Sequence, residues 1–99
     1  MPKFLAEEDH ADIVREAFAA QDGLEHLRVR RRGDLVVIES GPKKDPIAHA
    51  RFRRVTVHLW RLEMATHTGG WQPTLLRDLL ERLLPVLIHD FSWTLARFE

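Results

Sequence analysis

The chain has 99 residues, of which 44% are hydrophobic and 30% are charged, a balance typical of a single globular domain over residues 1–99 rather than a disordered segment. It contains no cysteine, which excludes disulfides and thiolate chemistry and is consistent with a cytoplasmic location. No apolar run is longer than four residues and the chain becomes acidic from Glu7 onward, so the sequence predicts neither a membrane span nor a signal peptide.

Charge is distributed unevenly along the chain although the net charge is zero. Residues 1–25 carry seven acidic and two basic side chains, and residues 26–61 carry three acidic and ten basic ones. Residues 62–99 carry five acidic and three basic side chains. Such asymmetry is typical of a partner-binding face, or of acidic helices that pack beside a basic sheet, and the sequence leaves both interpretations open.

The first predicted element is a helix over residues 6–21. Its apolar residues recur at helical spacing, and its first turn is acidic, where the helix dipole favours negative charge. A glycine follows as a stop. The apolar stripe consists of Ile13, Val14, Ala17 and Phe18.

Alternation of apolar and polar residues then predicts four or five strands. One hairpin covers residues 26–38 with a turn at Gly33-Asp34, and a second pairs residues 47–53 with residues 57–64. A short strand begins at Trp71. Because consecutive strands joined by short turns pair antiparallel, we expect a meander sheet.

Residues 73–91 carry the strongest periodic signal in the sequence. Leucines recur every three to four residues, which predicts a long helix that begins at Pro73 and packs on one face of the sheet. Pro85 is expected to kink this helix or to split it in two. Residues 92–98 are apolar enough that we expect them to pack back on the domain, as a strand in one interpretation. The predicted fold class is therefore α+β: an N-terminal helix, an antiparallel meander of four to five strands and a leucine-rich C-terminal helix.

Several short segments resemble a bacterial family of uncharacterised small domains. That family carries a Pro-Ile-Ala-x-x-Arg-aromatic segment before a Trp-x-Leu strand and a Gly-x-Trp turn. The resemblance implies a compact sheet with tryptophans near one turn, and it implies no particular activity. The matching residues here are Pro46, Ile47, Ala48, Arg51, Phe52, Trp60, Leu62, Gly69 and Trp71.

Motifs that carry chemistry are sparse. The sequence has no Gly-x-Ser-x-Gly elbow and no zinc-ligand spacing, and the basic loop at residues 41–44 lacks the glycine spacing of a P-loop. We therefore expect no catalytic residue, metal or cofactor, and a non-enzymatic role. The alternative is a small enzyme or metal-binding protein that uses His49 and His58, which would approach each other across a hairpin turned near residues 53–56.

Arginines at alternate strand positions are the strongest functional feature of the sequence. If both strands show these arginines to solvent on the same side of one sheet, they form a basic face that suits anionic groups, because the planar guanidinium donates in pairs. We predict a binding module for an acidic protein partner, with nucleic acid as the alternative and no membrane partner. The predicted contact residues are Arg28, Arg30, Arg32, Arg51 and Arg53.

Aromatic and apolar residues outnumber what a minimal core needs. A homodimer through the leucine-rich helix or the terminal segment would bury the surplus, whereas a broad helical lid over the sheet would also account for it. Phe52 and Trp60 alternate with the arginines, so we expect both side chains in the core rather than on the basic face.

Overall fold

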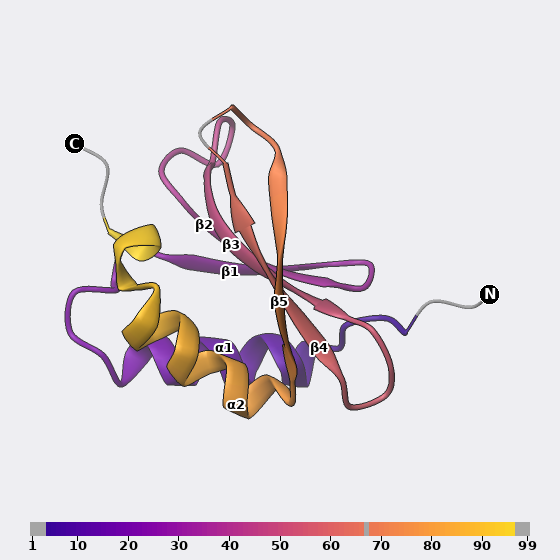
Figure 1. Ribbon diagram of the computed structural model, residues 1–99. Helices are drawn as coiled ribbons and strands as arrows, with labels where there is room; N and C mark the ends of the chain where they lie inside the picture. Colours follow the sequence, from indigo (N-terminus) through magenta and orange to yellow (C-terminus); the bar gives the residue numbers. More distant parts are fainter. Residues whose placement is uncertain (1–3, 67, 97–99) are drawn as a thin grey trace.

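The computed structural model describes residues 4–66 and 68–96 of the chain. It consists of one five-stranded antiparallel sheet with strand order β1-β2-β3-β4-β5 and a layer of helices (Figure 1). The predicted α+β class and the antiparallel meander are confirmed. The strands are β1 (Arg28–Arg32), β2 (Leu35–Ser40), β3 (Ile47–Arg54), β4 (Trp60–Ala65) and β5 (Trp71–Asp78).

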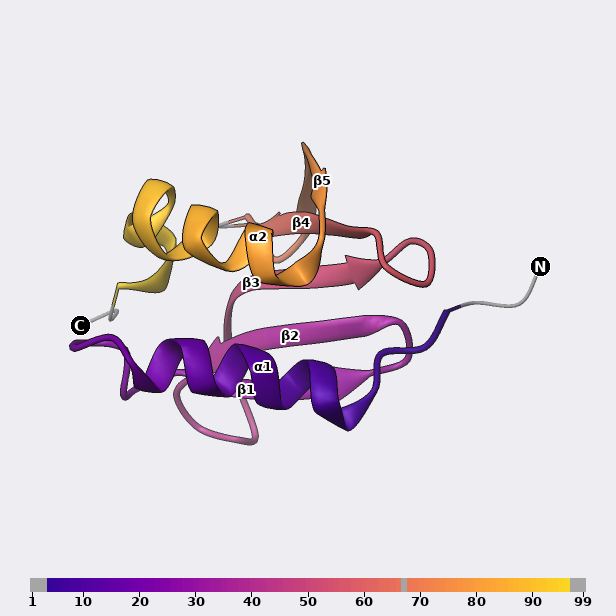
Figure 2. The same ribbon diagram turned by 90° about the horizontal axis from the view of Figure 1, so that it is seen from below.

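Both helices lie on the same face of the sheet. Figure 2 shows α1 (Glu8–Ala19) over β1 and β2, and α2 (Leu80–Pro85) over β4. The core fills the space between the two layers, where alternate strand residues meet the apolar stripes of the helices. Its largest fully buried side chains are Trp60, Phe52, Ile38, Leu62, Leu87, Leu95, Val14 and Val36.

The N-terminal helix forms where the sequence predicts it. Ala11, Val14 and Phe18 recur at helical spacing and are buried, which places one stripe of α1 against the sheet. At its start, the backbone N–H of Glu7 donates to Nδ1 of His10 at 2.9 Å and so satisfies one of the free donors of the first turn. Helix α1 packs against β1.

The predicted long C-terminal helix is wrong. Residues that were expected to form its first half belong to β5, and helical structure within residues 73–91 is limited to the six residues of α2 and a five-residue π-helical turn, Val86–Asp90. Pro73 lies in β5, at the edge of the sheet, where a missing N–H costs no ladder hydrogen bond. Pairing with the free edge of β4 therefore overrides the local helical periodicity.

A bulge in β5 explains how leucines at helical spacing fit a strand. The register pairs Arg61 with Arg77 and Glu63 with Pro73, so β5 uses two more residues than β4 over this stretch. The Thr74 hydroxyl donates to the carbonyl of Leu62 at 2.8 Å and accepts from the Leu76 N–H at 3.1 Å. Leu76 consequently turns toward the core.

The terminal segment packs back on the domain, as expected, but not as a strand. Residues Ser92–Leu95 form a 3₁₀ turn that contacts β3, and Leu95 is 1% exposed. Phe98, which was predicted to take part, lies outside the described residues. Among residues 4–66 and 68–96, no helix combines the length and apolar character that crossing a membrane requires.

Candidate anion-binding face

The sheet register places the predicted arginines on one face. We call this the open face: the side of the sheet that points away from α1 and α2. Residues directly opposite each other on neighbouring strands project to the same side. One such row runs through Arg30, Val37, Arg51 and Glu63, and a second runs through Arg32, Leu35, Arg53, Arg61 and Arg77, while Arg28 lies opposite Glu39.

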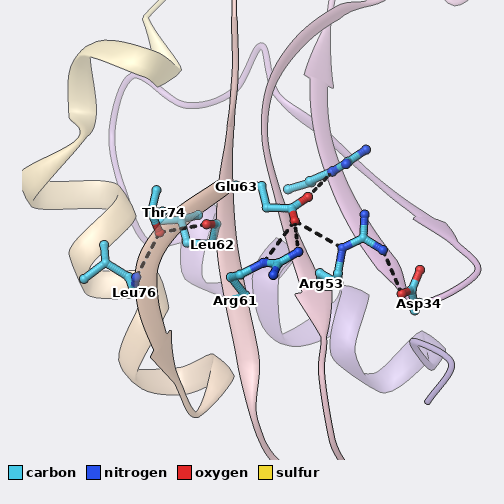
Figure 3. Close-up of polar contacts among 8 residues, drawn as sticks. Asp34, Arg53, Arg61, Leu62, Glu63, Thr74 and Leu76 are labelled. Carbon is cyan, nitrogen blue, oxygen red and sulfur yellow. Dashed lines mark hydrogen bonds and ion pairs between the residues drawn. The ribbon is translucent and has the colours of Figure 1, made fainter. Parts of the chain in front are cut away.

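Glu63 is the centre of this face. Its side chain is 3% exposed, and its carboxylate accepts hydrogen bonds from Nε of Arg51 at 2.6 Å, from Nε of Arg53 at 3.1 Å and from Nη2 of Arg61 at 2.6 Å (Figure 3). Burial alone raises the pKa of Glu63, but these hydrogen bonds outweigh it and lower the pKa to about 2. Glu63 is therefore ionised and holds three guanidinium groups in place.

Two further carboxylates compensate part of the remaining charge. Asp34 accepts from Nη1 of Arg53 at 3.0 Å, and Glu39 accepts from Nε and Nη2 of Arg30 at 3.1 and 3.3 Å. Three carboxylates thus bond to a face that carries seven arginines, which leaves four positive charges in excess.

The acidic N-terminal helix does not neutralise the predicted arginines. Its carboxylates pair instead with arginines on the helix side of the sheet: Glu8 lies 3.4 Å from Arg31, and Glu7 lies 3.9 Å from Arg54. Among the described residues, Arg32 and Arg77 form no ion pair, and both side chains are exposed. The uncompensated charge is therefore available at both edges of the open face.

Two features of this face lie outside the five arginines predicted as contact residues. Arg61 and Arg77 join the basic set through strand pairing, and Trp71 adds an aromatic ring over which the Arg51 guanidinium lies at 4.2 Å from the ring centroid. Trp71 pairs with Ala65, which shares the strand parity of Arg61 and Glu63, so the alternation of β4 places Trp71 on this face. Phe52 and Trp60, by contrast, are buried as predicted.

The two histidines of the alternative hypothesis do not approach each other. The register pairs Ala50 with Met64, and the turn lies at residues 55–59, so His49 and His58 lie at opposite ends of the β3–β4 hairpin. The expected proximity is wrong because that turn lies further along the chain than residues 53–56. Within the described residues, no group of three His, Asp or Glu side chains is placed to hold a metal ion.

His49 takes part in a buried hydrogen-bond chain instead. It is 2% exposed, its Nδ1 lies 2.6 Å from the carbonyl of Thr94, and its Nε2 lies 2.7 Å from the hydroxyl of Ser40. Burial, opposed by the bond to Thr94, lowers the pKa of His49. The neutral ring donates to the carbonyl from Nδ1 and accepts from the hydroxyl at Nε2, and so fastens the terminal 3₁₀ turn to β2 and β3.

Comparison with known protein families, with curated proteins and with solved structures finds no match to this chain. The resemblance to the bacterial family therefore stays a prediction. In the structure, Ala48 and Arg51 lie in β3, Leu62 is a fully buried residue of β4, and Gly69 adopts a positive φ in the turn before β5.

Proposed function

We propose that this chain is a non-enzymatic binding module whose open face receives an acidic segment of a partner protein. The single observation that carries the proposal is the convergence of seven arginines on one face of the sheet against three carboxylates. A surface with excess charge of one sign steers and orients a partner of the opposite sign.

The hydrogen bonds within the face prepare it for binding. Arg51, Arg53 and Arg61 are held by Glu63 before any partner arrives, so binding a carboxylate costs less side-chain entropy than it would with free arginines. Val37 lies between Arg30 and Arg51 in the register and is only 5% exposed, because the aliphatic stems of long side chains cover apolar surface. The face is therefore charged but ordered.

Nucleic acid is the second candidate, and the Arg51–Trp71 pair favours it. Bases of single strands stack on aromatic rings and on guanidinium planes, and this pair offers both at one point of the basic face. The two candidates differ in what the partner must supply: a protein segment needs only carboxylates, whereas a nucleic acid adds stacking to phosphate contacts.

Fluorescence anisotropy with a short polyglutamate peptide tests the proposal. Wild-type protein is expected to bind the peptide, and an R32Q/R77Q double variant is expected to bind at least about tenfold more weakly, since each lost ionic contact costs on the order of 1 kcal/mol. These arginines are exposed and have no ion pair among the described residues, so the double variant should keep the wild-type melting temperature.

R82Q is the matched control, because Arg82 is an exposed arginine on α2, on the helix side of the molecule. Equal affinities of R82Q and R32Q/R77Q would contradict the proposal. Tighter binding of a thymidine oligonucleotide than of polyglutamate, reduced by W71A, would instead select the nucleic-acid candidate.

A further inference from the structure

A cavity lies at the β1 end of the open face. It is open to solvent on one side, has a volume of about 530 Å³ and is lined by Arg28, Val29, Arg30, Glu39, Lys43 and Pro46. Its wall therefore contains three cationic side chains and one carboxylate. A volume of this size is typical of sites for small ligands or for a single recognised side chain.

The cations of this cavity are compensated only in part. Glu39 holds Arg30 from one side, while Arg28 and Lys43 form no ion pair within the described part of the chain. Nη1 of Arg28 donates to the carbonyl of Gly41, but its Nη2 is buried and has no hydrogen-bond partner among those residues. A charged donor in this state favours the entry of an acceptor, because a buried guanidinium N–H without a partner is costly.

The loop before β3 holds Lys43 at the rim of the cavity. Gly41 has a φ of 79°, which reverses the chain after β2, and the N–H of Asp45 donates to the carbonyl of Pro42 at 3.1 Å to close the next turn. Lys43 is exposed at this turn. The ammonium group can therefore reach over the cavity while the two arginines remain on the sheet.

We propose that this cavity binds a phosphate monoester carried by the acidic partner segment, for which phosphoserine is the simplest form. The inference rests on the proposed function, because Arg30 belongs both to the open face and to the cavity. Three cations and one carboxylate leave two positive charges, which match the charge of a phosphate monoester near neutral pH. A carboxylate would leave one of these charges uncompensated, and it lacks the third oxygen that three separate donors can share.

Binding engages each cation through a different contact. Lys43 contacts the phosphoryl oxygens as a point charge. Arg30 donates to them from the N–H groups that are not bonded to Glu39. Arg28 turns its Nη2 from its buried position toward the anion by side-chain rotation. The segment that carries the phosphate then continues across the open face toward Arg51 and Arg53.

The test compares two acidic peptides of equal charge, one with phosphoserine and one with additional glutamates in its place, by anisotropy at about 0.15 M salt, where distant charges are screened. Wild-type protein is expected to bind the phosphopeptide about tenfold more tightly, the effect of one well-formed charge-assisted hydrogen bond. K43Q should abolish that preference and keep the affinity for the glutamate peptide. R28Q should abolish the preference and also weaken binding of the glutamate peptide, because Arg28 belongs to the open face. R82Q should keep the preference.

R28K retains the positive charge but not the planar guanidinium, and it replaces R28Q in the test if R28Q does not fold. K43Q changes only an exposed side chain. Equal wild-type affinities for the two peptides would overturn the cavity inference and leave the proposed function standing. Failure of both peptides to bind would overturn the proposed function itself. A thymidine oligonucleotide with a 5′-phosphate that binds more tightly than the phosphopeptide would overturn the assignment to a protein partner.

Discussion

Glu63 connects stability and function at the scale of a single residue. A carboxylate that is 3% exposed would be costly to bury alone, and three arginines make it favourable. The same contacts order the guanidinium groups that are proposed to meet a partner. Removing the charge of Glu63 should therefore have opposite effects on the stability of the fold and on the attraction of the face for anions.

For E63Q we expect a loss of about 3 kcal/mol in the free energy of unfolding, because three partly buried arginines lose their shared counter-charge. Urea denaturation followed by circular dichroism measures this loss. Folded E63Q should bind polyglutamate more tightly than wild type, since the open face gains one positive charge. E16Q is the matched control, because Glu16 is exposed on α1; an E63Q variant as stable as E16Q would contradict this role of Glu63.

At the scale of elements, β5 and α2 divide one leucine-rich stretch between two structures. Leu75 is fully exposed at the bulge of β5, whereas Leu87 is fully buried in the π-helical turn that follows α2. Both were expected on the apolar stripe of a single helix. The bulge is stabilised by the Thr74 hydroxyl, which replaces ladder hydrogen bonds that the register shift removes.

Identical substitutions at these two leucines should give different results. We expect L87A to lower the free energy of unfolding by about 3 kcal/mol, because it leaves a cavity in the core. L75A should change it by less than about 0.5 kcal/mol, because its side chain makes no buried contact. Chemical denaturation of both variants measures the difference, and comparable losses would indicate that residues 73–91 form the long helix after all.

At the scale of the whole molecule, one buried and one partly buried histidine make the stability depend on pH. Burial lowers the pKa of His49, and burial together with Arg54 lowers the pKa of His10, below the unfolded value of 6.5. The unfolded chain therefore binds more protons as the pH falls through 6.5, and the stability decreases in that direction. Glu63 acts in a lower pH range. Its contribution to stability is complete above pH 4.5 and is lost as the pH falls toward about 2.

We expect the melting temperature of the wild type to fall between about pH 7.5 and about pH 5.5, as neutral histidines become protonated. Differential scanning calorimetry across this range measures the slope. H49Q should flatten the slope, because it removes the buried ring, and H58Q, at an exposed histidine of the β3–β4 turn, is the control. An identical slope in H49Q and wild type would show that His49 does not couple folding to pH.

The homodimer stays a prediction at this scale. Leu75 and Trp93 are exposed apolar side chains at separate places in the fold, and the sheet edge at β5 carries a proline and a bulge, which disfavour pairing with another strand. Light scattering distinguishes the monomer mass of 11.6 kDa from twice that mass.

Local patterns in the sequence determined α1, the meander of strands and the alternation that separates Phe52 and Trp60 from the arginines, because helical and strand periodicities are properties of neighbouring residues. Tertiary structure decided three other points. It paired residues 71–78 with the free edge of β4, it brought Glu63 and Trp71 beside Arg51, and it separated His49 from His58. Each of these depends on the strand register and on backbone hydrogen bonds between segments that are distant in the sequence. The periodicity of apolar residues within one segment does not specify such pairing.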